Sequence, residues 1–221
     1  MLRVRVGLSF FVLFFSSVFL FASFSTVHSE TEEATTSAMV NGMDTAALNA
    51  LIGHLKENPD KGRVTFYSKA RWQDGMRSFT GFKGYRVDGE MVHEKTRDFV
   101  LLGDEATEIG GTDTAPGAVE ELMYALSTCV IAAANANAAV MGVKLTRLEV
   151  NISSDIDLHG VFALDPEVRP GITNLKMDIT IAGDAEEEVL KKIAMLGYQY
   201  SPVSDTTRNG IQFTPEITVA N

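Results

Sequence analysis

The segment from about Ala118 to Met141 constrains the fold of this chain more than any other. After Glu120 and Glu121 it carries no charged side chain until Lys144, and its composition predicts one continuous helix. At 1.5 Å per residue such a helix is ~36 Å long. A helix that is apolar on nearly all sides must be buried in a large core or against a second subunit. With 221 residues in the chain, a homodimer is the favoured prediction.

The rest of the chain alternates between helical and strand patterns. Apolar residues recur at helical spacing over residues 44–58, and Asn58–Pro59 ends that helix. Between residues 62 and 102, alternating side chains and Asp–Gly turns predict three antiparallel strands. The remaining pattern predicts a strand, a strand, a helix ended by Ser201–Pro202, and a last strand, over residues 145–158, 174–181, 184–201 and 211–219. This order is that of an α+β domain with antiparallel sheets packed on two helices.

The first residues have the order of a secretory signal. Arg3 and Arg5 form a basic start, residues 7–24 are almost wholly apolar, and small residues follow at Ser25 and Ser29. We therefore expect an exported protein, periplasmic or secreted. The apolar run is longer than that of an ordinary signal and is just long enough to span a bilayer. An uncleaved membrane anchor formed by residues 7–24 is the alternative.

The sequence thus divides into three parts. Residues 1–29 are predicted to be a signal peptide or anchor, and residues 30–42 a flexible linker that is polar over most of its length. Residues 43–221 are predicted to be one folded domain that includes the helix at 44–58.

Charge and motifs exclude several classes of function. The formal net charge is −10, and the sequence has no Lys/Arg stripe of the kind that a phosphate backbone requires, so no nucleic-acid partner is expected. Gly110–Gly111 lacks the Lys and the following Ser or Thr of a phosphate-binding loop. No Cys/His cluster has the spacing of a metal site. We expect neither a cofactor nor a metal.

The chain has one cysteine, Cys129, so it cannot form an internal disulfide. A lone cysteine in an exported protein is either well buried or reactive. Cys129 lies about three turns into the long helix, too deep for the helix N-terminus to lower its pKa. A reactive thiolate would need a cation from a loop or a strand end, and the candidates are Arg71, Arg77, Arg208 and His93. Composition and spacing favour neither alternative.

Two segments resemble the osmotically induced protein C / organic hydroperoxide resistance (OsmC/Ohr) family. They are Thr112–Cys129 (TDTAPGAVEELMYALSTC) and Tyr200–Gly210 (YSPVSDTTRNG). The resemblance extends from about Gly62 to the C-terminus, and the preceding helix with Asn41–Gly42 resembles an extension found in one branch. It implies an OsmC-like fold and an intertwined homodimer with two sites at the interface, where each helix-borne cysteine faces strands of the partner.

The resemblance also implies a chemistry. Peroxidases of this family reduce organic hydroperoxides through a helix-borne Cys thiolate, which corresponds here to Cys129. The thiolate becomes a sulfenic acid, and a second cysteine then condenses with it to a disulfide. In this sequence Ser201 stands at the position of the second cysteine. A serine cannot resolve a sulfenic acid, so turnover would need an external thiol.

The charged groups of the family site are displaced as well. The resemblance implies an Arg–Glu pair that keeps the thiolate ionised. The position of the carboxylate is Val119, and the next residue is Glu120. The position of the arginine is Gln73, with Arg71 and Arg77 on either side.

Two functions from different classes follow. The first is a thiol-dependent protein of oxidative-stress defence that reduces organic hydroperoxides through Cys129, with Glu120, Arg77 or Arg71 as supporting groups and an external thiol as reductant. The alternative is a dimer that binds a small apolar molecule on the same scaffold without peroxidase turnover. A purely structural Cys129 is the third interpretation.

Overall fold

The computed structural model describes residues 39–220. The predicted signal or anchor and most of the predicted linker lie outside the described residues. Residues 39–44, at the junction of the linker and the domain, form a short hairpin in which Met39 pairs with Asp44 and Val40 with Met43.

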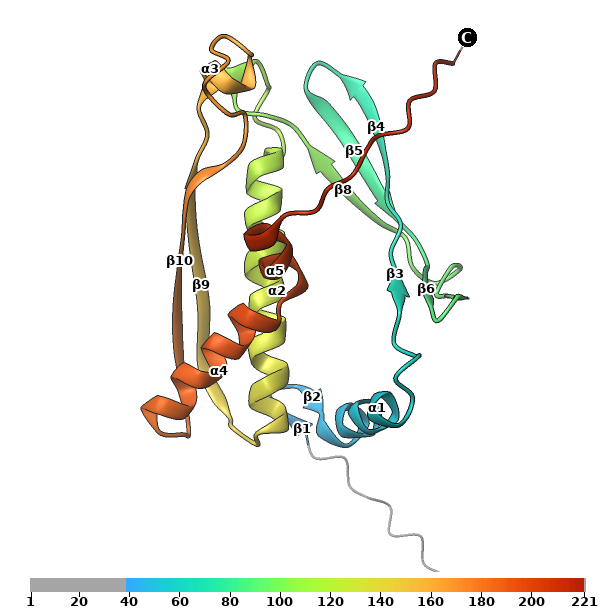
Figure 1. The fold of residues 1–221 in the computed structure, drawn as a ribbon, viewed down its shortest axis with the longest axis vertical. Helices are drawn as coiled ribbons and strands as arrows, with labels where there is room; N and C mark the ends of the chain where they lie inside the picture. Colours follow the sequence, from blue (N-terminus) through green and yellow to red (C-terminus); the bar gives the residue numbers. More distant parts are fainter. Residues whose placement is uncertain (1–38, 221) are drawn as a thin grey trace, which may run out of the picture. The chain divides into compact units, whose positions relative to one another are not determined.

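Helices and short antiparallel sheets alternate along the chain (Figure 1). The strands are β1 (Met39–Val40), β2 (Met43–Asp44), β3 (Val64–Thr65), β4 (Lys69–Asp74), β5 (Arg77–Phe82), β6 (Tyr85–Val87), β7 (Glu90–Val92), β8 (Phe99–Gly103), β9 (Leu145–Asp155) and β10 (Thr173–Gly183). The helices are α1 (Thr45–Glu57), the 3-10 turn η1 (Thr107–Ile109), α2 (Ala118–Val140), α3 (Leu158–Val161), α4 (Glu187–Tyr200) and α5 (Pro202–Asn209). The predicted α+β class with antiparallel sheets is confirmed.

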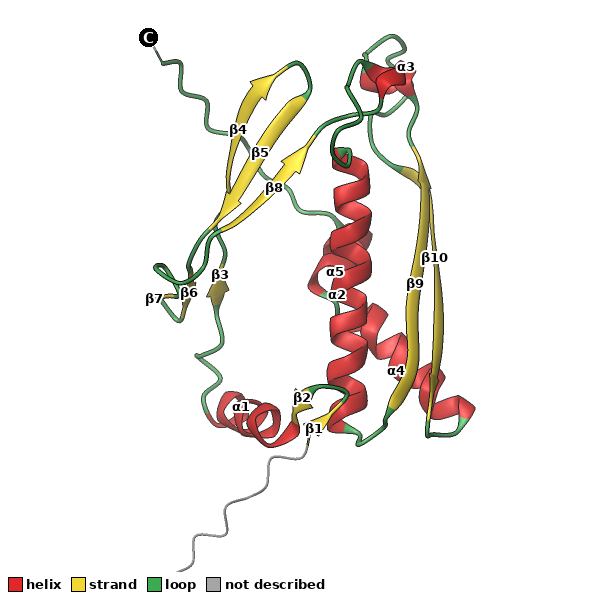
Figure 2. Ribbon diagram, turned by 180° about the vertical axis from the view of Figure 1, so that it is seen from behind, coloured by secondary structure: helices red, strands yellow, loops and turns green. Residues whose placement is uncertain are grey.

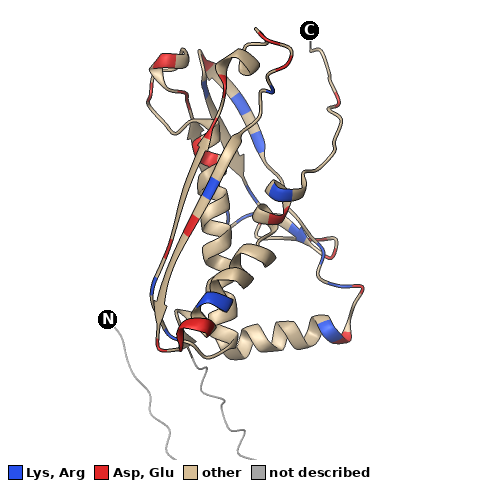
Figure 3. Cartoon of the chain, turned by 60° about the vertical axis from the view of Figure 1, so that its left-hand side comes forward, with Lys and Arg blue, Asp and Glu red and all other residues tan. Residues whose placement is uncertain are grey.

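Helix α2 is the long apolar helix that the sequence predicts. Four of its five buried residues follow one stripe at a spacing of four, namely Leu126, Val130, Ala134 and Ala138, and the fifth is Ala139. The stripe faces α4 and β9, whereas Tyr124 on another side is 64 % exposed. Among the described residues, α2 alone has the length and composition that would also suit a membrane span. Figure 3 shows it without charged residues beyond its first turns.

A close helix crossing forms the centre of the core. Ala134, Ala138, Val143 and Ile193 make the buried cluster between α2 and α4. At Gly197 on α4 the backbones approach so closely that a Cβ would lie 2.6 Å from the Cβ of Ala134. Only glycine fits here without displacing a helix.

Strands β9 and β10 form a long antiparallel ladder beside α2 (Figure 2). Side chains alternate along β9: Leu148, Val150 and Ile152 are partly buried, whereas Glu149 and Asn151 are exposed. The period-2 pattern of the sequence predicts this half-buried ladder correctly. The α2 and α4 helices cover its inner face.

The second three-stranded sheet differs from the expectation. Its order is β4-β5-β8, and no described helix packs against it extensively within the chain. Every residue of β4 is exposed, Trp72 at 76 %, and β8 exposes Phe99 and Leu102 at 58 % each. Of the two helices on which the sequence predicts the sheets to pack, neither covers this sheet within the chain.

The C-terminal segment also departs from the prediction. Residues 211–219 alternate as a strand does, but they pair with no strand in the described part of the chain and form no regular structure. Ile211, Phe213 and Ile217 are 64 %, 85 % and 82 % exposed.

Ser201–Pro202, interpreted from sequence as the end of a helix, also begins a further helix, α5. Ser201 caps it, and proline is suited to a first helical position.

Candidate functional site

Cys129 lies on α2 with a free, half-buried thiol. It is twelve residues beyond the N-cap Gly117, or roughly 18 Å along the helix. At that depth the helix dipole has no effect on the thiol, because its influence fades within the first turn. One turn away in each direction stand Ala125, Ala132 and Ala133, which are partly exposed or exposed. The sulfur therefore has small neighbours on a flank that is incompletely covered by its own chain.

Ser201 occupies a buried corner between α4 and α5. Its side chain is 0 % exposed, and its hydroxyl accepts a hydrogen bond of 3.1 Å from the backbone N–H of Ser204. Helix α5 packs on both α2 and α4. The hydroxyl is thus engaged as a helix cap, and an oxygen at this position cannot form a disulfide.

Glu120 is engaged at the beginning of α2. Its carboxylate accepts a hydrogen bond of 2.8 Å from the backbone N–H of Gly117, as the third-residue glutamate of a capping box does. Nine residues separate it from Cys129 on the helix, or ~13.5 Å. Glu120 therefore stabilises the helix start. Val119, at the position where the resemblance implies a carboxylate, contributes an apolar side chain to a cavity.

The two arginine candidates lie on the β4–β5 hairpin. Arg77 donates to Asp74 through Nε at 2.8 Å and through Nη2 at 2.6 Å. These hydrogen bonds raise the pKa of Arg77 and lower the pKa of Asp74. Arg71 is exposed on β4 opposite Phe79. Because the β4-β5-β8 sheet does not pack extensively on α2, the single chain does not hold either arginine in a sheet that covers the Cys129 helix.

Asp104 has a structural role that was not predicted from the sequence. It is buried, with 2 % exposed, and accepts hydrogen bonds from Thr112 Oγ1 at 2.6 Å, Thr114 N at 3.0 Å and Thr114 Oγ1 at 2.8 Å. The hydrogen bond from the Thr112 side chain, followed by that from the Thr114 backbone, holds the pKa of Asp104 far below its usual range. Asp104 thereby fixes the loop that leads into α2. The Thr-x-Thr spacing is the sequence signal that could have revealed it.

Two cavities lie along α2, toward its N-terminal half. The larger has a volume of about 1070 Å³ and the smaller about 480 Å³. Apolar side chains dominate both, among them Val119, Leu122, Phe162, Leu126 and Met195. Cys129 lines neither cavity. Leu126, one turn before Cys129, forms part of the wall of the smaller one.

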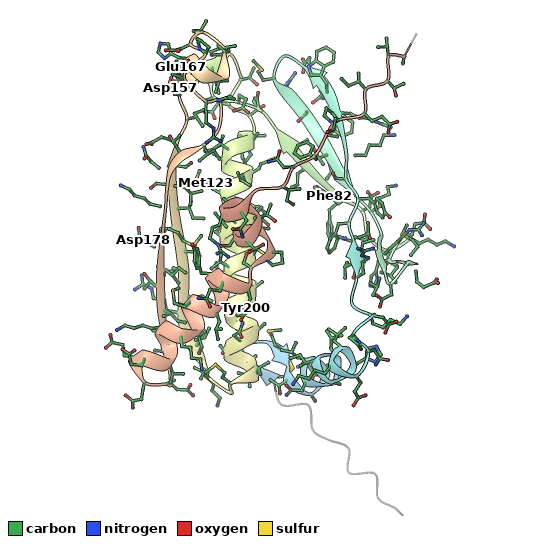
Figure 4. The ribbon with its side chains drawn as sticks, in the orientation of Figure 1. Phe82, Met123, Asp157, Glu167, Asp178 and Tyr200 are labelled. Carbon is green, nitrogen blue, oxygen red and sulfur yellow. The ribbon has the colours of Figure 1, made fainter. Side chains whose placement is uncertain are left out.

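A second sulfur atom, that of Met123, lies between α2 and the β9–β10 ladder. Figure 4 shows Met123 on the side of α2 that faces the ladder, and its sulfur accepts a hydrogen bond of 3.6 Å from Ser154. Within residues 39–220, no group of three or more His, Cys, Asp or Glu side chains is placed to hold a metal ion.

Several solved structures align with the chain. An OsmC-like protein from Mycoplasma pneumoniae is 14% identical, with a TM-score of 0.49 over 66% of this chain and 89% of its own. An organic hydroperoxide resistance protein from Elizabethkingia anophelis is 15% identical, with a TM-score of 0.44 over 67% and 91%. One from Vibrio cholerae, with captopril in one of its active sites, is 15% identical, with a TM-score of 0.37 over 65% and 85%.

These TM-scores are below 0.5, so the assignment of a family does not rest on them. No curated protein matches the sequence. The match that decides is to a family model described as OsmC-like protein, and it extends over residues 111–216. This segment contains the loop held by Asp104, the whole of α2 with Cys129, the β9–β10 ladder, and α4 and α5. Residues 111–216 of this chain thus match the model of the OsmC-like family.

Proposed function

We propose that this protein is a one-cysteine OsmC-like thiol protein that reduces apolar organic hydroperoxides at Cys129. The observation that carries the proposal is the state of that residue: a free, half-buried thiol in the middle of α2, within the segment that matches the family. Its neighbours Ala125, Ala132 and Ala133 leave room beside the sulfur for a small reactant. Cavities with apolar walls begin one turn away, at Leu126.

The reaction has two stages. The Cys129 thiolate attacks the terminal oxygen of the hydroperoxide, so that an S–O bond forms, the O–O bond breaks, and an alcohol leaves after taking up a proton. Sulfur is oxidised by two electrons to a sulfenic acid. An external dithiol then reduces it: the first thiol forms a mixed disulfide and releases water, and the second thiol displaces Cys129. Ser201 cannot replace either thiol.

A second copy of the chain completes the proposed site. The β4-β5-β8 sheet and residues 211–219 expose apolar side chains that a single chain leaves in water, including Trp72 at 76 %, Phe213 at 85 % and Val219 at 86 %. Surfaces of this kind mark protein interfaces. We infer a homodimer in which these surfaces cover each other, and in which Arg71 or Arg77 of one copy supplies the cation for the thiolate of the other. For this, Arg77 would have to leave Asp74 and pair with the Cys129 thiolate of the other copy.

A peroxide-consumption assay tests the proposal. Purified protein is mixed with cumene hydroperoxide and a dithiol, beside Cys129→Ser and, as matched control, Ser127→Ala two positions earlier on α2. We expect consumption by the wild type and the control, and none above background by Cys129→Ser. Equal, slow consumption by all three proteins would refute the enzymatic function. Light scattering at several protein concentrations tests the dimer independently.

One observation favours a second candidate function. Among residues 39–220, no ion pair or hydrogen bond joins a Lys or Arg to Cys129, whereas the apolar cavities beside α2 are large enough for a small molecule. An OsmC-like dimer that binds an apolar ligand without turnover would keep its ligand affinity in Cys129→Ser. In this second function the wild type does not consume peroxide, and Cys129→Ser binds the ligand as the wild type does. That combination of results separates the two functions.

A further inference from the structure

The two cavities along α2 are neighbours. Leu175 on β10 and Thr207 on α5 line both of them, so one pair of side chains separates the larger from the smaller. On α2, Leu122 lines the first cavity and Leu126 the second. These residues are one turn apart on the same side of the helix, ~6 Å along its axis. The two cavities therefore adjoin at Leu175 and Thr207, beside α2, β10 and α5.

Each cavity has one charged residue in its lining. Glu105 borders the larger cavity, where its carboxylate accepts a hydrogen bond of 3.3 Å from the backbone N–H of Ala118. This acid is engaged at the start of α2. Arg208 borders the smaller cavity, and it is the one cation among the residues that line either of them. The adjoining cavities are thus mostly apolar, with a positive charge where α4 and α5 line the smaller one.

Neighbouring residues hold the Arg208 guanidinium in place, and some of its N–H groups are left to donate to a ligand. Its guanidinium lies 4.7 Å from the centre of the Tyr198 ring, and Nη2 donates to the carbonyl of Gln199 at 3.4 Å. Asp205 forms an ion pair with it at 3.5 Å, but that carboxylate is 61 % exposed. A guanidinium has five N–H donors. Its planar edge matches the two oxygens of a carboxylate.

We propose that the joined cavities bind a straight-chain carboxylate, with the carboxylate at Arg208 and the alkyl chain extending past Leu175 into the larger cavity. The head of the ligand would pair with the one lining cation, and the apolar walls would cover the chain. This site needs no chemistry at Cys129, which lines neither cavity. A straight-chain carboxylate is the ligand class for the apolar-ligand function proposed above, so the site rests on that proposal, and it requires no reaction at the thiol.

Binding of laurate and of its methyl ester to the full chain tests the charge at the head. Titration calorimetry compares the wild type with Arg208→Gln. The loss of charge-assisted hydrogen bonds weakens laurate binding on the order of tenfold, and leaves the uncharged ester unaffected. Equal affinity of the wild type for acid and ester, no binding of laurate, or an unchanged affinity in Arg208→Gln would each overturn the proposal.

Two further variants test the geometry. Leu175→Trp closes the passage between the cavities, and we expect it to lose laurate binding while it retains hexanoate at Arg208; retention of laurate would contradict the continuous site. Cys129→Ser should keep the affinity for laurate, and a loss would place the ligand at the thiol instead. If Arg208→Gln fails to fold by circular dichroism, Arg208→Lys takes its place. It keeps the charge without the planar fork, so a reduced preference for acid over ester supports the site and an unchanged preference overturns it.

Discussion

The crossing of α2 and α4 at Gly197 is a helix contact without room for one added methyl group. In Gly197→Ala the new Cβ would stand 2.6 Å from the Cβ of Ala134 and 2.9 Å from the carbonyl oxygen of Val130. Carbon atoms in contact are ~3.5–4.0 Å apart. The helices must therefore separate by about 1 Å for the side chain to fit.

The magnitude follows from two opposing effects. Forcing a methyl group into a well-packed contact costs about 1–3 kcal/mol. Alanine is itself the better helix former, by ~0.8–1 kcal/mol relative to glycine. Gly53 on α1 supplies the matched control, because a Cβ there meets nothing within 4 Å. Both variants share the gain in helix propensity, so their unfolding free energies should differ by the packing cost, about 1–3 kcal/mol.

Urea unfolding followed by circular dichroism, at one fixed protein concentration, measures the difference. At this chain length, ~2–4 °C in Tm corresponds to each kcal/mol, so thermal scans should separate the two variants as well. The strain at Val130 and Ala134 adjoins Cys129, and the alkylation rate of its thiol should change only in Gly197→Ala. If Gly197→Ala and Gly53→Ala change the free energy of unfolding equally, the added Cβ at Gly197 has no packing cost and the reasoning is refuted.

Two predictions concern acidic residues beside α2. The folded state lowers the pKa of Asp104 from its usual value of 3.8, mainly through the hydrogen bond from Thr112. The ionised carboxylate therefore stabilises the fold fully above pH 3.8. This contribution is lost as the pH falls toward the folded-state pKa. Acid unfolding curves of Asp104→Asn should lack this dependence; an unchanged acid limb would contradict it. Because Glu120 caps α2, Glu120→Gln, which keeps an acceptor oxygen, should consume hydroperoxide as the wild type does, whereas Glu120→Ala should lower Tm with a stability loss of about 0.5–2 kcal/mol. A drop in turnover in Glu120→Gln without a change in Tm would instead make its charge part of the chemistry.

Local sequence patterns predicted an element correctly where its side chains repeat at a regular spacing. The charge-free run of α2 and the alternation of Leu148, Val150 and Ile152 predict the central helix and the ladder beside it. The same reasoning missed α5, because Ser201–Pro202 ends one helix and also begins the next. It missed Asp104 as well, since its partners Thr112 and Thr114 approach it only when the loop before α2 closes.

The candidate site was predictable only in part. Sequence and family resemblance placed Cys129 on an apolar helix and identified Ser201 at the position of a second cysteine. They left open which groups surround the sulfur. The structure shows that Glu120 is engaged in capping α2 and that Arg77 is paired with Asp74, because hydrogen bonds to near neighbours form at both residues.

The amino-acid sequence alone was enough to predict the main helices and strands and a single cysteine on the longest helix, because helix and strand periods depend on side chains a few residues apart. Which faces of these elements are covered follows from the three-dimensional fold alone. The β4-β5-β8 sheet and residues 211–219 have the alternation of buried strands, yet they lie exposed in the single chain. Burial depends on contacts between residues far apart in the sequence, and no local pattern specifies those contacts.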